Sequence, residues 1–171
     1  MSKTRLGFIY GFSSYTLWGL FPLYWPLLKP ATPLEMVSHR AVWSLVICVI
    51  ALAIGHQLKS TFTLMLSPGI FWKFTLAAGF ISVNWLTYIW AVNNEQIVEA
   101  SLGYYMQPIL LVLMGILAFK EEMRKIQWVA FIVATVGVII LTIDYGRPPW
   151  ISFALAFSWS SYSFMKKKTN L

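Results

Sequence analysis

The charged residues of this chain are confined to short segments that separate long apolar runs. Cutting the sequence at these charges leaves six runs of the length that a helix needs to cross a membrane, about 20 residues. The predicted spans are residues 6–28, 36–55, 74–94, 100–119, 126–143 and 148–165. A backbone in lipid must satisfy its own hydrogen bonds, so these runs predict an all-α, polytopic transmembrane bundle of about six helices.

The composition agrees with a membrane protein and excludes several other classes. Hydrophobic residues make up 58% of the chain and charged residues only 11%, whereas soluble domains are about 45–50% apolar and about 25% charged. The net charge of +7 does not indicate a nucleic-acid partner, because the Lys and Arg residues lie between apolar runs. Cys48 is the single cysteine, and no Cys/His spacing is typical of a metal site. We therefore expect neither a metal nor a cofactor.

The distribution of Lys and Arg predicts how the helices are oriented. Short cytoplasmic loops retain positive charge, whereas short translocated loops lose it. With the N-terminus inside, ten basic residues fall on the cytoplasmic side: Lys3, Arg5, Lys59, Lys73, Lys120, Arg124, Lys125, Lys166, Lys167 and Lys168. Only Lys29 and Arg147 fall in the opposite loops, which contain the acidic residues Glu35, Glu95, Glu99 and Asp144. Both termini are predicted to be cytoplasmic. The longer link, residues 56–72, is predicted to be an amphipathic cytoplasmic connection.

Arg40 is the one fully charged side chain well inside an apolar run. A charge within a membrane span is a functional hypothesis by default, and a guanidinium there could bind an anionic group of a substrate. The other interpretation is that Arg40, about two turns from the end of its helix, extends to the lipid headgroups. The sequence leaves both open. His39 and Glu35 lie nearby on the same helix, one turn apart.

Three predicted helices each carry one polar and aromatic face at helical spacing. These faces consist of Asn84, Thr87, Tyr88 and Ala91; Ser101, Tyr104, Tyr105 and Pro108; and Tyr15, Trp18 and Pro22. Pro108 also interrupts the helical hydrogen bonds, where freed carbonyls can line a cavity. Together the faces could enclose a pocket for a small amphipathic solute. The alternative is simple packing between helices with hydrogen-bonded side chains.

A weak internal repeat suggests how the chain is divided. The first and last spans share an aromatic, small, any, aromatic pattern at Trp18–Phe21 and Trp159–Tyr162. Many transporters consist of two repeats of opposite orientation. The pattern thus predicts one five-helix unit over residues 1–145 and the first helix of a second, inverted unit over residues 146–171.

Several motifs, taken in order, carry a resemblance to a known family. They are Trp18-Gly19 with Pro22, Pro33-Leu34-Glu35 through His39-Arg40, Asn84-Trp85-Leu86-Thr87-Tyr88, Ala100-Ser101-Leu102-Gly103-Tyr104, Gln107-Pro108, and Glu121 ahead of Gln127-Trp128. As a set, they resemble the RarD-type branch of the EamA drug/metabolite transporters. The resemblance implies ten helices in two inverted repeats, a multi-pass location in the bacterial inner membrane, and export or exchange of small metabolites or drugs. This branch is described by a link to chloramphenicol sensitivity.

The resemblance also assigns family positions and shows two departures. The family Arg maps to Arg40, the family Pro to Pro108 and the acid that follows to Glu121. Lys120 stands where the family usually has Gly, which puts a tight loop there in doubt. The 171 residues correspond to one repeat and one further helix, so we expect a truncated product or a fragment of a longer transporter.

From these observations the sequence predicts a secondary transporter rather than an enzyme. The predicted substrate-binding residues are Trp18, Arg40, Asn84, Tyr88, Tyr105 and Pro108. The expected partners are a small-molecule substrate, the lipid bilayer, and either a second copy of the chain or the remainder of the second repeat. Two alternatives remain: a membrane enzyme that uses His39 with Glu35 on a lipid-linked substrate, and a non-catalytic membrane subunit. The sequence has no P-loop and no potassium-channel filter motif, which disfavours ATP-driven transport and potassium conduction.

Overall fold

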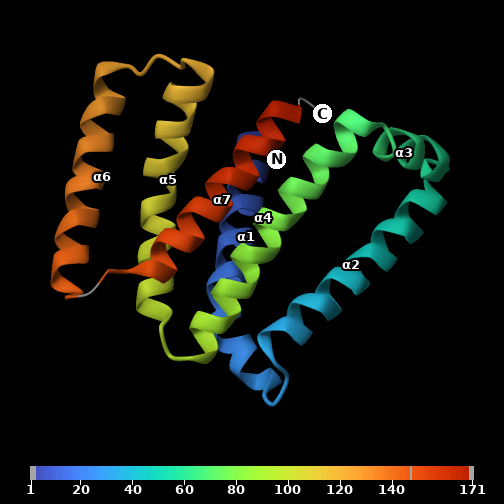
Figure 1. The fold of residues 1–171 in the computed structure, drawn as a ribbon, viewed down its shortest axis with the longest axis horizontal. Coiled ribbons are helices and arrows are strands. Elements are labelled where there is room, and N and C mark those ends of the chain that lie inside the picture. Colours follow the sequence, from blue (N-terminus) through green and yellow to red (C-terminus); the bar gives the residue numbers. More distant parts are fainter. Residues whose placement is uncertain (1–2, 147, 170–171) are drawn as a thin grey trace.

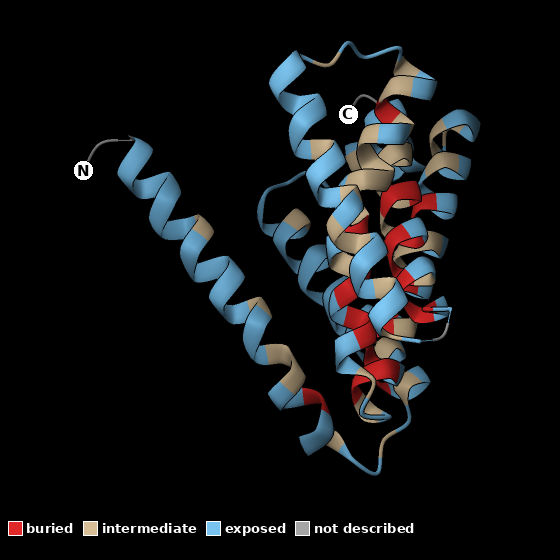
Figure 2. Cartoon of the chain, turned by 90° about the vertical axis from the view of Figure 1, so that its left-hand side faces the viewer, coloured by how far each residue is buried: buried red, intermediate tan, exposed pale blue. Residues whose placement is uncertain are grey.

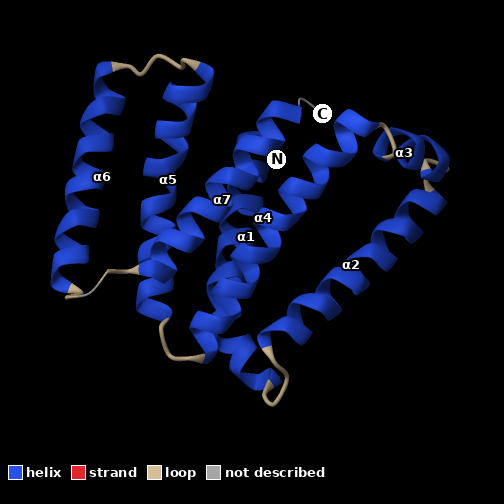
Figure 3. Ribbon diagram, in the orientation of Figure 1, coloured by secondary structure: helices blue, strands red, loops and turns tan. Residues whose placement is uncertain are grey.

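The computed structural model describes residues 3–146 and 148–169, and every regular element in that part of the chain is a helix (Figure 3). In order they are α1 (Lys3–Tyr24), the 3₁₀ turn η1 (Trp25–Leu28), α2 (Pro33–Ile54), α3 (Leu58–Met65), α4 (Pro68–Asn93), α5 (Ile97–Phe119), α6 (Lys125–Asp144) and α7 (Trp150–Thr169). Each predicted span coincides with one of these helices, which confirms the all-α bundle. The link between α2 and α4 contains the short helix α3.

Four described helices are long and apolar enough to cross a membrane by length and composition: α2, α4, α5 and α6. The helices at the other two predicted spans, α1 and α7, contain 22 and 20 residues but are richer in Ser, Tyr and Trp. Helix α4 begins at Pro68, six residues before the predicted start at residue 74. The predicted span began after Lys73 because that residue is charged. A lysine can nevertheless lie in a helix near its end, because its long side chain reaches the headgroup region.

The helices alternate in direction, which gives the bundle a basic end and an acidic end (Figure 1). The basic end holds the start of α1, helix α3, the α5–α6 loop and the end of α7, and it contains the ten basic residues predicted to be cytoplasmic. The acidic end holds η1, the α4–α5 turn and the α6–α7 link, with Lys29 as its basic side chain among the described residues. Arg147, predicted on the same side, lies outside the described residues. The chain therefore begins and ends its helical part on one side, as predicted.

The core of the structure is formed by α4, α5 and α7. Helix α7 packs against both α4 and α5, and its Ile151, Leu155 and Ala156 are almost fully buried. Gly103 on α5 permits this close approach, since a Cβ added there would lie 3.0 Å from both the Leu155 Cβ and the Ser152 backbone. Figure 2 shows buried residues concentrated in this part of the molecule. A small residue at the crossing thus allows the two helices to meet.

Buried polar side chains also attach α7 to its neighbours. The Asn84 side-chain amide on α4 donates to the Leu155 carbonyl at 2.9 Å and to the Ser158 hydroxyl at 3.0 Å. The Glu99 carboxylate on α5 accepts from the Ile151 N–H at 2.8 Å and from the Tyr145 hydroxyl at 2.7 Å. Asn84 and Glu99 are each only 1% exposed. These bonds satisfy polar groups that would otherwise be costly inside an apolar bundle.

Helix α1 differs, because it diverges from the bundle along most of its length (Figure 2). None of its described residues is buried, and Tyr15 is 83% exposed. Contact with the bundle comes near its end, where Trp18 and Phe21 pack against the core around Trp85. The predicted polar face of α1 therefore contributes Trp18 to the interior, whereas Tyr15 is exposed.

The predicted face of α4 is mostly buried, with Thr87 half-buried. The predicted face of α5 is mostly exposed, although Tyr104 is half-buried and packs on Tyr88. Asn84, Tyr88 and Ala91 are buried on α4. On α5, however, Ser101, Tyr105 and Pro108 are exposed, whereas the buried residues are Glu99, Ala100, Leu102, Gly103, Met106 and Gly115. Close contact with α7 at Gly103 decides which side of α5 faces inward, and this contact is not visible in the polar pattern of α5 alone.

A tight turn does form after α5, although Lys120 replaces the glycine usual in the family. Lys120 has φ of 53° in the left-handed region, and its N–H bonds the Gly115 carbonyl. Glycine is favoured at such a helix end, because other L-residues adopt this conformation at some cost. The adjacent Glu121 forms an ion pair with Lys167 at the end of α7. The turn is therefore compatible with lysine and also contacts α7.

Candidate functional site

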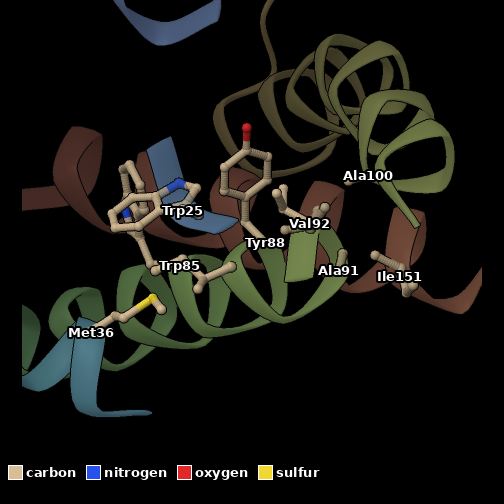
Figure 4. Close-up of a cluster of buried hydrophobic side chains, with 10 residues drawn as sticks. Trp25, Met36, Trp85, Tyr88, Ala91, Val92, Ala100 and Ile151 are labelled. Atoms are coloured by element: carbon tan, nitrogen blue, oxygen red, sulfur yellow. The ribbon is translucent and has the colours of Figure 1, made fainter. Parts of the chain in front are cut away.

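Trp85 on α4 is the centre of a group of aromatic side chains near the acidic end. Its ring centroid lies 5.3 Å from that of Trp18, and 6.1, 6.2 and 6.1 Å from those of Phe21, Trp25 and Tyr88. We call the following set the aromatic cluster: Trp18, Phe21, Trp25, Trp85, Tyr88, Tyr104 and Trp159. It draws on α1, η1, α4, α5 and α7, and Figure 4 shows Trp25, Trp85 and Tyr88 within it.

Arg40 extends from α2 onto this cluster. Its guanidinium carbon lies 3.2 Å from the centroid of the Trp85 ring, so the cation is stacked on the indole. Planar guanidinium groups favour such stacking, and the ring face attracts the cation. No carboxylate among the described residues forms an ion pair with Arg40. The Trp85 ring thus holds the guanidinium in place, and the guanidinium N–H groups have no anionic partner among the described residues.

Two cavities meet at Arg40. The larger, of about 500 Å³, lies between η1 and α2 and is lined by Phe21, Tyr24, Trp25, Leu28, Ala31, Met36, His39, Arg40 and Trp43. We call it the η1–α2 cavity. A smaller one, of about 190 Å³, includes Arg40, Trp85 and Ser82. Trp25 is 5% exposed, and its indole N–H has no hydrogen-bond partner. The η1–α2 cavity therefore has the guanidinium donors of Arg40 beside mostly apolar walls.

The structure brings only some of the predicted substrate-binding residues together. Trp18, Arg40 and Tyr88 all contact Trp85. Asn84 faces α7 instead, with both of its donated bonds used there. Tyr105 is 68% exposed, and Pro108 lines a separate cavity of about 640 Å³ between α5 and α6. The six residues thus divide among the aromatic cluster, the α7 interface, the surface of α5 and the α5–α6 cavity.

Sequence reasoning overlooked the two tryptophans that organise the site. Trp85 follows Asn84 directly, so the two point about 100° apart on the helix and Trp85 was not part of the polar face. Its own face is Trp85, Tyr88 and Val92, which recur at helical spacing and are all buried. Trp25 falls in the short η1 turn after Pro22, where no helical periodicity applies. The apolar pattern at three- and four-residue spacing on α4 could have identified the first of them.

The remaining polar candidates have other roles. Glu35 forms a capping box at the start of α2, because its carboxylate accepts from the Thr32 N–H at 2.7 Å and its own N–H donates to the Thr32 hydroxyl. His39 lines the η1–α2 cavity. Among residues 3–146 and 148–169 no three His, Cys, Asp or Glu side chains gather in a way that could hold a metal ion.

Long apolar helices, a single basic end and a cation stacked on an aromatic cluster define a polytopic α-helical membrane protein. The EamA-like transporter family matches residues 5–143, and the chain belongs to that family. The predicted resemblance is therefore confirmed. No solved structure gives a significant match.

Curated relatives cover nearly the whole chain. Protein RarD of Streptomyces exfoliatus is 47% identical over 170 residues, which are 99% of this chain and 54% of that protein. The uncharacterized transporter YojE of Bacillus subtilis is 44% identical over 174 residues, 99% of this chain and 58% of that protein. An uncharacterized transporter of Vibrio cholerae is 38% identical, with 96% and 54% covered. The chain thus spans a little over half the length of these relatives.

Proposed function

We propose that the chain forms part of the substrate path of a secondary transporter for small metabolites or drugs in the bacterial inner membrane. The observation that supports this most is Arg40, a cation within an apolar helix that stacks on Trp85 beside a cavity of about 500 Å³. Intramembrane charges that border a cavity are typical of substrate and ion pathways. The family and the relatives named as transporters favour the same class.

The membrane-enzyme alternative is less favoured by the geometry. That hypothesis needed His39 and Glu35 to act as a pair of catalytic groups. The Glu35 carboxylate is instead engaged with the Thr32 backbone at the start of α2. His39 lines the cavity without an adjacent carboxylate in the same lining, which fits a wall of a binding site better than general acid–base chemistry.

Chloramphenicol is the first solute to test. A more distant relative from Pseudomonas aeruginosa, 27% identical over 169 residues, is named chloramphenicol-sensitive protein RarD. Chloramphenicol combines an aromatic ring with nitro and amide oxygens, which are hydrogen-bond acceptors. Such a molecule matches the aromatic walls and the donors of the η1–α2 cavity in kind.

The test is solute flux in liposomes that contain the purified chain. If Arg40 binds the solute, Arg40→Lys and Arg40→Gln should each lower chloramphenicol flux at least tenfold, because lysine retains the charge but loses the planar set of donors. Arg124→Lys, in the α5–α6 loop, serves as the matched control and should leave flux unchanged. Protein abundance should be the same for all four proteins. Thermal unfolding is measured as well, so that any effect of losing the Arg40–Trp85 stack is separated from the loss of flux.

Two results would contradict the proposal. Full flux in Arg40→Lys would mean that any cation suffices, as expected for a side chain that only reaches the headgroups. No flux above that of protein-free liposomes, for chloramphenicol and for the aromatic carboxylate described below, would argue against transport by this chain.

A further inference from the structure

We infer that the η1–α2 cavity binds the acidic group of an organic anion, a carboxylate or a phosphate ester, whose apolar and preferably flat body lies against its aromatic wall. This inference rests on the proposed function, because it names the class of solute that the site at Arg40 accepts. Two observations made independently of one another support it: an unmatched cation and an unmatched buried donor.

The first observation is the electrostatics of the cavity. Arg40 borders it, no Asp or Glu lines it, and no described carboxylate pairs with the guanidinium. The stacking on Trp85 occupies the face of the guanidinium, while its N–H groups point outward in the guanidinium plane, where an oxyanion binds. A positively charged ligand would be repelled by Arg40. The charge at this site thus favours an anion.

The second observation is the Trp25 indole. It is 5% exposed, it lines the same cavity, and its N–H finds no acceptor. Buried donors are almost always paired. The indole nitrogen is enclosed by its neighbours, so an acceptor in the cavity reaches this unpaired donor when the Trp25 ring turns towards it. An indole N–H can only donate, and so can a guanidinium. Both groups therefore favour a ligand that carries acceptor oxygens.

The rest of the lining defines the body of the ligand. Apart from Arg40 and His39 the wall consists of aromatic and aliphatic side chains, with Phe21, Tyr24 and Trp43 providing ring surface. A cavity of about 500 Å³ is within the range of small-molecule sites, about 300–1,000 Å³. Aromatic walls pack well against flat apolar groups. An aromatic monoanion combines all these features.

Two sources could supply this chemistry: a dissolved organic anion, or the phosphate of an anionic lipid at the acidic end of the bundle. We favour the dissolved anion, because the exposed Glu35, Glu95 and Asp144 at the acidic end face the many charges of an anionic lipid surface but only the single charge of a dissolved monoanion. The experiment separates the two by changing the lipid while keeping the probe.

The probe is benzoate, compared with the uncharged benzamide of similar shape. The purified full chain is placed in nanodiscs of phosphatidylcholine alone, and binding is measured by calorimetric titration. Benzoate should bind at least tenfold more tightly than benzamide. Trp25→Phe keeps the ring but removes the donor, and the loss of a hydrogen bond to a charged group should weaken benzoate binding about 10- to 100-fold.

Controls show that the effect belongs to this site. Arg40→Gln should weaken benzoate binding at least tenfold, and it serves as the second variant if Trp25→Phe lowers the thermal unfolding temperature. Trp128→Phe makes the same chemical change on α6, outside the cavity lining, and should leave benzoate affinity unchanged.

In nanodiscs with phosphatidylglycerol, unchanged benzoate affinity supports a dissolved anion, whereas loss of affinity through competition identifies the lipid phosphate as the occupant.

The inference is overturned if benzoate and benzamide bind equally, if neither binds, or if Trp25→Phe and Arg40→Gln both bind benzoate as the unaltered chain does. These results are distinct from failure of the proposed function. Benzoate binding without any solute flux contradicts transport and leaves the anion site in place. Chloramphenicol flux with no benzoate binding leaves transport in place and removes the anion site.

Discussion

Helices α1 and α7 share a sequence pattern and a similar length, yet the structure holds them very differently. Helix α7 lies between α4 and α5, with Ile151, Ser152 and Ser160 at 0% exposure. Helix α1 has no buried residue among those described and contacts the bundle through the aromatic rings near its end. The aromatic pattern that they share therefore does not decide burial.

The difference lies in small residues and polar bonds. Helix α7 crosses α5 closely at Gly103. Its Leu155 carbonyl accepts a hydrogen bond from Asn84, and its Ile151 N–H donates one to Glu99. Gly7 and Gly11 on α1 form a similar small-residue pair, but a Cβ added at either would meet no neighbouring helix within 4 Å. Because lipid is as apolar as the helices, close packing and polar pairs rather than hydrophobicity hold membrane helices together. Three substitutions test this contrast.

The largest effect is expected at the α5–α7 crossing. Gly103→Leu would push against Leu155 and the Ser152 backbone, and overpacking of this kind costs about 3 kcal/mol of unfolding free energy. Gly11→Leu on α1 meets open space and should change it by less than about 0.5 kcal/mol. Equilibrium unfolding in mixed micelles with increasing dodecyl sulfate measures both. Similar losses in the two variants would remove the distinction between the helices.

A smaller effect is expected at Glu99. Glu99→Gln keeps the shape, but its amide nitrogen cannot accept, so the bond from Ile151 or that from Tyr145 is lost. Bonds to a charged group contribute about 2 kcal/mol each, which sets the expected loss of stability. Glu95→Gln, at an exposed position in the α4–α5 turn, is the control and should be near neutral. The unfolding assay used for Gly103→Leu should show this loss in Glu99→Gln alone; equal stability of Glu99→Gln and Glu95→Gln would contradict this role.

The smallest effect is expected at Asn84. Asn84→Leu removes the bonds to the Leu155 carbonyl and the Ser158 hydroxyl, and polar bonds between membrane helices contribute about 0.6 kcal/mol on average. We therefore expect a loss of about 1 kcal/mol in the same unfolding assay. Thr16→Val on α1 removes a hydroxyl that bonds only within its own helix and should change stability by a few tenths at most, about 0.3 kcal/mol. A larger loss for Thr16→Val than for Asn84→Leu would reverse the comparison.

The helices and their order could be predicted from the sequence because charges interrupt the apolar runs so clearly. The face of α4 was also predictable, since Asn84, Tyr88 and Ala91 recur at helical spacing and one side of that helix is buried. The face of α5 was not, because Gly103 draws α7 to the opposite side. A glycine signals that a neighbour can approach, but not which neighbour does.

The site was predicted in part for the same reason. Arg40, Trp18 and Tyr88 stood out by local chemistry, and the structure brings them to one ring, although their role in binding a substrate stays a prediction. Glu99 was taken as a loop acid, and its burial arises only when the start of α7, 52 residues later, folds over it. Trp25 became relevant only when η1 placed it beside Arg40. The proposed division of the chain at residue 145 stays a prediction.

The attachment of α7 also has a consequence for the order in which the chain is made. Glu99 precedes its partner Ile151 by 52 residues, which at about 5–20 residues per second is a delay of about 3 to 10 s during synthesis. Once Phe119 has been added α5 is complete, yet Tyr145 and Ile151, which donate to the Glu99 carboxylate, have not been synthesised, and neither has Leu155, which accepts from the Asn84 amide. We expect water or lipid headgroups to solvate both side chains until then, and α4 and α5 to reach their final depth only after α7 has emerged.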